Sequence, residues 1–315
     1  MILHLADKKL FNDTIRAASE HLKINQMFIE KDYWITLILN RLSQTNFANE
    51  TVFKGGTSLS KGFGLVNRFS EDVDIAIIND ADKSGNSVKN IIRAVEKEMT
   101  KELNEVNLRG ITSKGSMFRK SVFEYPTFNT KYKNNRLIVE INSFANPFPN
   151  QKCEIKSFIY DFLKETNNSK YIEEYLLQPF TINILRKEQT LLEKLVSLIR
   201  FSFHKDYIQG LSTKIRHFYD LHYLINDSEC IEFTKFADFK NRFHEILEHD
   251  KKIFDDPKDW QLKQLSESPI IHDFANVWQK LKDKYKIELS ALAFGEIPDE
   301  KEVSKSFEKI LKYLH

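Results

Sequence analysis

The sequence predicts an α/β protein of the α+β type, in which a mixed sheet with flanking helices is followed by a mainly helical C-terminal lobe. Residues 72–78, Asp-Val-Asp-Ile-Ala-Ile-Ile, are rich in β-branched residues and bounded by polar ones, which is typical of a strand. Strand patterns alternate with helical patterns before residue 150, whereas helical patterns dominate after it. We therefore expect two domains, residues 1–155 with the sheet and the N-terminal helices, and residues 156–315 with the helical lobe.

Four more stretches have strand character, and most of the remaining chain has helical periodicity. The other expected strands are residues 51–54, 121–128, 136–144 and 180–185. The first of them ends at Gly55-Gly56, and a short helix is expected from Ser58. The longer expected helices are two within residues 10–44 and one each over residues 87–103, 188–203, 212–226, 231–253, 271–286 and 300–313.

Composition excludes several classes of protein. The 315 residues include only 9 glycines and 7 prolines, too few for a collagen-like or low-complexity chain. Two cysteines, Cys153 and Cys230, build neither a disulfide scaffold nor a zinc site made mainly of thiolates. Charged residues from Asp7 onward interrupt the apolar N-terminus, and no apolar run is long enough to cross a bilayer. We therefore expect a cytoplasmic protein with no membrane partner.

A glycine turn before the expected short helix has the features of a phosphate-binding turn. Gly55 and Gly56 let the backbone turn sharply and approach a ligand without a Cβ in the way. The helix that follows presents free N–H groups and the positive end of its dipole to an anion. Thr57 and Ser58 add hydroxyl donors. The pattern therefore predicts that this turn holds phosphate.

Two acids on the clearest strand suggest a metal site. Asp72 and Asp74 lie two residues apart, so their side chains share one face of the sheet. Neighbouring carboxylates repel unless a cation lies between them, and Mg²⁺ held by carboxylates and substrate phosphates is the usual solution. A third carboxylate is expected on a neighbouring strand, where Glu140 is the candidate, although a solvent-facing strand residue explains Glu140 equally well. A phosphate turn beside a two-metal clamp would equip the chain for phosphoryl or nucleotidyl transfer, whereas the plain alternative is a polar strand end after a turn.

These segments resemble the nucleotidyltransferase superfamily and, within it, the AbiEii/AbiGii toxin family. Five segments between residues 28 and 225 carry the resemblance, and residues beyond about 230 match nothing recognisable. They are Glu30-Lys-Asp-Tyr-Trp34, Gly55-Gly-Thr-Ser-Leu-Ser-Lys61, Arg68-Phe-Ser-Glu-Asp-Val-Asp-Ile75, Leu192-Glu-Lys-Leu195 and Lys214-Ile-Arg-His-Phe-Tyr-Asp-Leu221. The resemblance implies a nucleotidyltransferase-type sheet, transfer of a nucleoside monophosphate from an NTP, dependence on Mg²⁺, and a cognate antitoxin as partner.

The resemblance also assigns roles to four acids and one lysine. Asp72 and Asp74 would bind two magnesium ions and the triphosphate, and Glu140 would be a third metal ligand or the base that accepts the hydroxyl proton. Lys194 and Asp220 correspond to a lysine and an aspartate that the family needs for activity. An ammonium at Lys194 would offset triphosphate charge, and Asp220 would orient either Lys194 or the incoming hydroxyl. Both residues could instead be exposed helix residues in ordinary salt bridges.

The same resemblance gives a nucleotide-binding set around the glycine turn. Arg68 reaches a phosphate or pairs with Glu71, and the sequence does not distinguish the two. The full expected set is Gly55, Gly56, Thr57, Ser58, Lys61 and Arg68.

The expected acceptor is RNA, most specifically a tRNA. The resemblance implies it, because members of the family have been tied to nucleotide addition at tRNA 3′ ends. Residues 111–136 carry a local charge of +5, from Lys114, Arg119, Lys120, Lys131, Lys133 and Arg136 against Glu124. This stretch suits a polyanion, although a solvated loop explains it equally well. The alternatives are a small-molecule or protein acceptor, or a catalytically inactive nucleotide-binding partner of a regulator.

Overall fold

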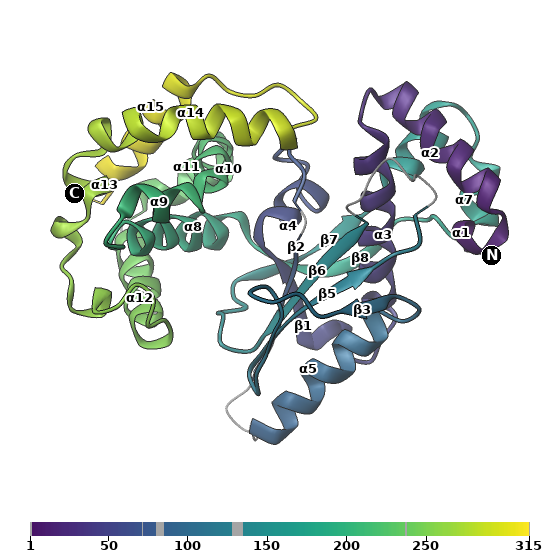
Figure 1. Cartoon of the computed structure of the whole chain (residues 1–315), viewed down its shortest axis with the longest axis horizontal. Coiled ribbons are helices and arrows are strands. Elements are labelled where there is room, and N and C mark those ends of the chain that lie inside the picture. Colours follow the sequence, from purple (N-terminus) through teal and green to yellow (C-terminus); the bar gives the residue numbers. More distant parts are fainter. Residues whose placement is uncertain (1, 71, 80–84, 128–134, 237, 315) are drawn as a thin grey trace. The chain divides into compact units, whose positions relative to one another are not determined.

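The computed structural model describes residues 2–70, 72–79, 85–127, 135–236 and 238–314, and it divides into two compact units (Figure 1). The first unit comprises Met1–Gly64 and Phe69–Leu185, and the second comprises Leu65–Arg68 and Arg186–His315. The division therefore falls after residue 185 rather than after residue 155. The fold class is the predicted one, a mixed α/β protein with one sheet and many helices.

The described residues of the first unit form an eight-stranded sheet in the order β3-β5-β6-β2-β1-β8-β7, with β4 paired to β5. β2 runs parallel to β6 and β1 runs parallel to β8, whereas the other neighbours are antiparallel, so the sheet is mixed. The strands are β1 (Thr51–Lys54), β2 (Asp72–Ile77), β3 (Asn104–Val106), β4 (Ser113–Lys114), β5 (Phe118–Glu124), β6 (Arg136–Asn142), β7 (Asn150–Ile155) and β8 (Phe180–Leu185).

All five expected strands lie in this sheet, and three further strands were not anticipated. β3 and β4 are short and mostly exposed, so they lack the apolar alternation that marks a half-buried strand. β7 is an edge strand with the polar sequence Asn-Gln-Lys-Cys-Glu-Ile. Edge strands often carry charged and polar residues, which hides them from a hydrophobic pattern.

Helices pack against the sheet of the first unit and against one another. α3 contributes much of the core, with Trp34, Ile38 and Leu39 almost fully buried, and it contacts α5 and α6. The helices are α1 (Leu3–Ala6), α2 (Lys8–Leu22), α3 (Gln26–Ser43), α4 (Gly55–Lys61), α5 (Gly85–Met99), α6 (Phe158–Glu165) and α7 (Lys170–Glu174), with a 3₁₀ turn over Ala48–Glu50.

The second unit is helical, and α10 lies at its centre in contact with α8, α11, α14 and α15. Phe218 of α10 packs against Phe274, Trp278 and Phe307. The helices are α8 (Lys187–Phe201), α9 (Tyr207–Ser212), α10 (Ile215–Asn226), α11 (Ser228–Lys235), α12 (Asp238–Ile253), α13 (Pro269–His272), α14 (Phe274–Leu292) and α15 (Glu300–Lys312), with 3₁₀ turns at Trp260–Leu262 and Leu265–Glu267. The single helix expected over 231–253 is thus two helices. Among the described residues, no helix is long and apolar enough to span a membrane.

A short excursion of the chain joins this helical unit. Residues Leu65–Arg68 lie between α4 and β2 in the sequence but pack with the helices of the second unit. Asn67 donates its backbone N–H to the hydroxyl of Tyr219 over 3.3 Å, and Arg68 forms an isolated antiparallel bridge with Ala293. This excursion was not predicted, because it contains too few residues to show any periodicity.

Candidate active site

Strand register brings the three expected carboxylates to one part of the sheet. Asp74 of β2 lies opposite Glu140 of the parallel strand β6 and opposite Lys54 of the antiparallel strand β1. Lys120 of β5 lies opposite Glu140 on its other side. These four residues form a cross-strand row, Lys54–Asp74–Glu140–Lys120, and Asp72 shares its face two residues before Asp74. We call them, with Asp72, the acidic row.

The alternation of β2 explains why the acids face away from the core. Val73 and Ile75 are fully buried, whereas Asp72 and Asp74, which alternate with them, are partly exposed. The local sequence therefore fixes the face of the acids through burial of their apolar neighbours.

The acidic row is strongly coupled electrostatically. The pKa of Asp74 is raised from 3.8 to about 8, first by burial and then by the negative charges of Glu140 and Asp72, against the opposing effects of Lys54 and Lys120. Nζ of Lys120 lies 3.3 Å from Oε2 of Glu140. Burial on its own would lower the pKa of Lys120, but the surrounding acids, Glu140 first, outweigh burial and raise it. Three carboxylates thus compete for the charge of two lysines.

The acidic row suits a hard divalent cation by its donor chemistry. Carboxylate oxygens are the ligands that Mg²⁺ prefers, and a divalent cation would relieve the repulsion that raises the pKa of Asp74. Among the described residues, however, no group of three or more His, Cys, Asp or Glu side chains is already arranged to hold a metal ion. Glu140 is paired with Lys120, so Asp72 and Asp74 are the first ligands to consider.

The glycine turn leaves room for the side chain of Asp74 as well as for a ligand. Gly55 has φ +80°, a left-handed conformation that favours glycine, and a Cβ added to it would lie 2.1 Å from Oδ2 of Asp74. The absence of a Cβ at residue 55 therefore gives Asp74 its place. Gly56, the next residue, belongs to the first turn of α4.

The two hydroxyls after the glycines bond within the protein. The hydroxyl of Thr57 donates to the carbonyl oxygen of Asp72, and the hydroxyl of Ser58 donates to the carbonyl oxygen of Gly55 over 2.8 Å. The first of these bonds ties α4 to β2 directly beside the acids. A phosphate held by Thr57 or Ser58 would have to replace these bonds, which leaves the backbone N–H groups of α4 as the simpler phosphate donors.

Lys61, for which a nucleotide contact is expected, has a carboxylate partner within the protein. Nζ of Lys61 lies 2.7 Å from Oδ1 of Asp32 in α3, and both side chains are buried. Oδ2 of Asp32 accepts the backbone N–H of Phe158 over 2.8 Å at the start of α6. Because both charges are buried and neutralise each other, we assign Lys61 and Asp32 to joining α3, α4 and α6.

In the second unit, Asp220 holds two cations. Arg68 donates from Nε to Oδ1 and from Nη2 to Oδ2 of Asp220, each over 2.6 Å, and Nζ of Lys194 lies 2.7 Å from Oδ2. Asp220 is fully buried, and Arg68 and Lys194 are nearly so. Burial alone would raise the pKa of Asp220, but Arg68 and Lys194 outweigh burial and lower it.

This arrangement bears on the alternatives left open by the sequence. Lys194 and Asp220 are not exposed helix residues in ordinary salt bridges, because both are buried and paired with each other. The ion pair is what the first of the two roles considered for Asp220, that of orienting Lys194, would require. Arg68 forms a bidentate pair with Asp220, and its contact with a phosphate stays a prediction; Glu71, the other partner considered for Arg68, lies outside the described residues.

Sequence reasoning missed three residues that belong to these two clusters. Lys54 and Lys120 enter the acidic row through strand register, which a sequence pattern does not reveal. His217 precedes Asp220 by one turn of α10, and within the described part of the chain its buried Nδ1 has no hydrogen-bond partner. Burial lowers the pKa of His217 far below its usual range, and the charge of Lys194 lowers it further, so this imidazole is neutral.

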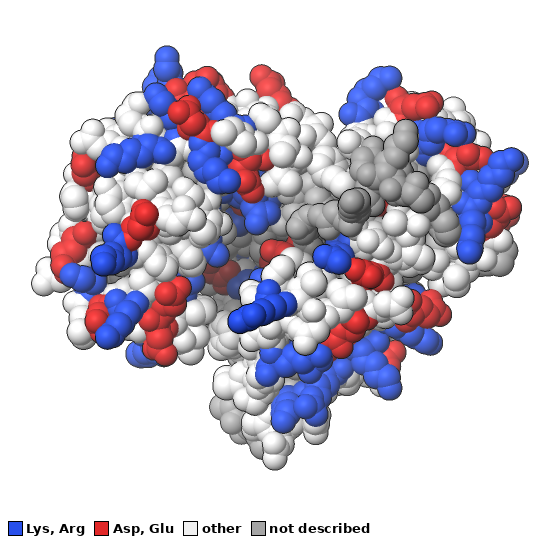
Figure 2. Space-filling view, in the orientation of Figure 1, with Lys and Arg blue, Asp and Glu red and all other residues white. Residues whose placement is uncertain are grey.

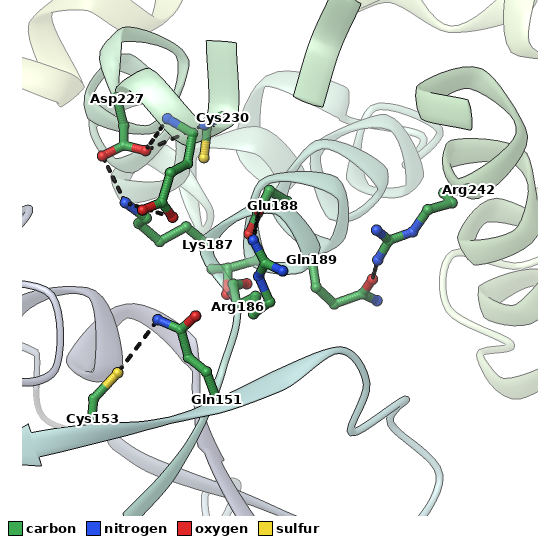
Figure 3. A network of polar contacts seen from close by, with 11 residues as sticks. Gln151, Cys153, Arg186, Lys187, Glu188, Gln189, Asp227, Cys230 and Arg242 are labelled. Carbon is green, nitrogen blue, oxygen red and sulfur yellow. Dashed lines mark hydrogen bonds and ion pairs between the residues drawn. The ribbon is translucent and has the colours of Figure 1, made fainter. Parts of the chain in front are cut away.

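A polar network fixes the start of α8, the helix that carries Lys194 (Figure 3). Nζ of Lys187 lies 2.8 Å from Oδ2 of Asp227, and Arg242 donates to the side-chain oxygen of Gln189 over 2.8 Å. These contacts join α8 to α11 and α12. Cys230 lies nearby and is buried, and burial raises the pKa of its thiol, which keeps it protonated and unreactive. In the first unit, Gln151 donates to Sγ of Cys153 over 3.6 Å (Figure 3).

The basic stretch of residues 111–136 is less positive in space than along the sequence. Four of its six basic residues form ion pairs, three of them with acids that lie outside the stretch. The other two, Lys131 and Lys133, lie outside the described residues. The described pairs are Lys114–Glu105, Arg119–Glu96, Lys120–Glu140 and Arg136–Glu124. This stretch alone therefore gives little support to RNA binding. Figure 2 nevertheless shows many lysine and arginine side chains over the part of the first unit where α5 and β3 lie.

A mixed sheet that carries an acidic row beside a glycine turn is the arrangement that the sequence motifs predict for a nucleotidyltransferase. Residues 37–312 match the family described as nucleotidyl transferase AbiEii toxin, type IV toxin–antitoxin system, and the chain belongs to this family. It is therefore a nucleotidyltransferase toxin, for which the family implies an NTP substrate and an antitoxin partner. The match extends well beyond residue 230, where the sequence motifs ended, so α11 to α15 are part of the family domain.

Among solved structures, the chain is similar to MenT4, a nucleotidyltransferase toxin from Mycobacterium tuberculosis H37Rv. The two chains share 16% sequence identity, the similarity covers 96% of this chain and 99% of MenT4, and the TM-score is 0.49. No curated protein matches the sequence.

Proposed function

We propose that this toxin transfers a nucleoside monophosphate from an NTP to the 3′ hydroxyl of a tRNA in the cytoplasm, and thereby blocks translation and growth. The observation that carries the proposal is the strand register that gathers Asp72, Asp74 and Glu140 on one face of the sheet. Membership of the AbiEii family supports the toxin role, and the tRNA acceptor rests on the family resemblance of the sequence motifs.

Mg²⁺ is the proposed cofactor, held by Asp72 and Asp74 with Glu140 as the third candidate ligand. When bound, Mg²⁺ would neutralise triphosphate charge and favour attack at the α-phosphorus. Asp72 and Asp74 lie on a strand whose partners on both sides are fixed by backbone hydrogen bonds, so their carboxylates are positioned before a ligand arrives. The backbone N–H groups at Gly56 and the rest of the first turn of α4 are the proposed donors to the β- and γ-phosphates.

In the proposed reaction, the acceptor oxygen forms a bond to the α-phosphorus while the bond to the bridging oxygen of pyrophosphate breaks. Glu140 accepts the hydroxyl proton, and pyrophosphate leaves with the electron pair of the broken bond. In the second unit, Asp220 keeps the ammonium of Lys194 oriented, and the family resemblance assigns this pair to the activity. Arg68 holds the other side of Asp220, so its role in this scheme is to position the pair.

A transfer assay tests the proposal directly. The purified protein is incubated with each labelled NTP, Mg²⁺ and total RNA, with Asp72→Asn as the inactive control. Label in tRNA that depends on Asp72 would support the proposal, and label in protein or in a small molecule would redirect it to another acceptor. If no label enters any acceptor while Asp72→Asn still inhibits growth, the chain acts as a binding partner and the transferase proposal fails.

A further inference from the structure

The acidic row ends in a cation to which the proposed reaction assigns no role. Lys120 lies opposite Glu140 on the neighbouring strand, with its ammonium 3.3 Å from Oε2 of Glu140. The two side chains are 29% and 25% exposed, so the pair is shielded from solvent over most of its surface. Asp72 and Asp74 also act electrostatically on Lys120, which places one lysine within the field of three carboxylates.

We propose that Lys120 is the counter-ion that stabilises the acidic row before metal binds, and that it competes with the divalent cation for Glu140. The inference rests on the proposed metal-dependent function. Lys120 acts through Glu140 and is therefore a positioning residue. In this arrangement Glu140 is paired with Lys120 when metal is absent. It becomes available to metal or to the acceptor hydroxyl once that ion pair breaks.

The physical reason is the excess of negative charge. Three carboxylates on neighbouring strand positions repel one another, and unlike an exposed surface pair, a partly buried pair is poorly screened by salt. An ammonium and a divalent cation both favour the same carboxylates but repel each other at short range. Removal of the ammonium should therefore strengthen metal binding and lower the stability of the metal-free protein.

A second lysine pair on the same sheet provides a matched control. Nζ of Lys114 in β4 lies 2.5 Å from Oε1 of Glu105 in β3, and the side chains are 44% and 38% exposed. Lys114→Met removes the same charge as Lys120→Met and breaks one ion pair. It does so at a pair that includes no member of the acidic row.

The first measurement is the affinity of the full chain for Mn²⁺ without nucleotide, monitored by electron paramagnetic resonance. We expect Lys120→Met to bind Mn²⁺ about tenfold more tightly than the wild type, which corresponds to about 1.4 kcal/mol. Lys120→Arg, which retains the charge, and Lys114→Met should bind as the wild type does. Lys120→Gln serves as a second neutral variant if Lys120→Met does not fold.

The second measurement is thermal unfolding in EDTA and in saturating Mn²⁺. Lys120→Met should melt below the wild type in EDTA and regain that difference in Mn²⁺, because a tighter ligand stabilises the folded state more. A melting difference that is the same in both conditions would show a merely structural ion pair and overturn the inference. Equal Mn²⁺ affinity of wild type and both neutral variants would also overturn it, while leaving the metal proposal intact. Absence of Mn²⁺ binding to all the proteins, wild type included, would instead refute the metal proposal on which the inference rests.

Discussion

Gly55→Ala separates the position of an active-site acid from the stability of the fold. A Cβ at residue 55 would lie 2.1 Å from Oδ2 of Asp74, and side chains in folded proteins essentially never approach a Cβ closer than 3.0 Å. The carboxylate must therefore retreat by about 1 Å, a displacement that can reduce catalysis about 100-fold when it affects a reacting group. Oδ2 is the end of a side chain that can rotate, so we expect Asp74 to move while the backbone stays in place.

A matched glycine isolates this effect. Gly110 has φ +82°, almost the same as Gly55, and a Cβ added there would meet no atom within 4 Å. Both alanine variants should lose about 1–2 kcal/mol of stability in urea unfolding, from left-handed backbone strain alone. Only Gly55→Ala should also lose nucleotidyl transfer by about 100-fold, measured with labelled NTP. Full activity of Gly55→Ala, or an equal loss in Gly110→Ala, would refute the reasoning.

Three further predictions concern buried charges. Asp220→Ala should cost about 3–5 kcal/mol in urea unfolding, because it leaves two buried cations without their carboxylate, and a cost below about 1 kcal/mol would contradict this. Lys61→Met should likewise destabilise by about 3–5 kcal/mol by stranding Asp32, while NTP affinity of the folded variant, measured by calorimetry, stays unchanged; a selective loss of NTP affinity would restore its nucleotide role. Because the pKa of Asp74 is raised from 3.8 to about 8, its contribution to stability is complete below pH 3.8 and is lost as the pH rises toward 8. In EDTA, Asp74→Asn should remove this decline in unfolding free energy, and parallel pH profiles of the two proteins would argue against it.

The sequence was informative where one face of a strand is buried. β2 was predictable because Val73 and Ile75 enter the core, and the same alternation placed Asp72 and Asp74 on the other face. The sequence did not reveal which strands neighbour β2. Lys54 and Lys120 enter the acidic row only through the register of β1 and β5. Register depends on long-range pairing, which short sequence patterns do not encode.

Buried ion pairs were the second limit of sequence reasoning. Arg68 and Lys61 occur in phosphate-like contexts, next to a glycine turn and an acid pair, so a ligand contact was the natural interpretation. The structure gives each a carboxylate far along the chain, Asp220 for Arg68 and Asp32 for Lys61. The local sequence spacing does not distinguish a basic residue that binds substrate from one that is neutralised by a buried carboxylate.

The excursion of Leu65–Arg68 affects how this toxin can be divided. The chain passes between the two units after Gly64, after Arg68 and again after Leu185, so three connections rather than a single linker join the units. A gene split after codon 185 would place Arg68 on one polypeptide and its carboxylate partner Asp220 on the other. The N-terminal product would then carry Arg68 without Asp220, and the C-terminal product would lack residues Leu65–Arg68 of its own unit. We therefore expect that neither fragment folds on its own and that reassembly of both is needed to recover the toxin.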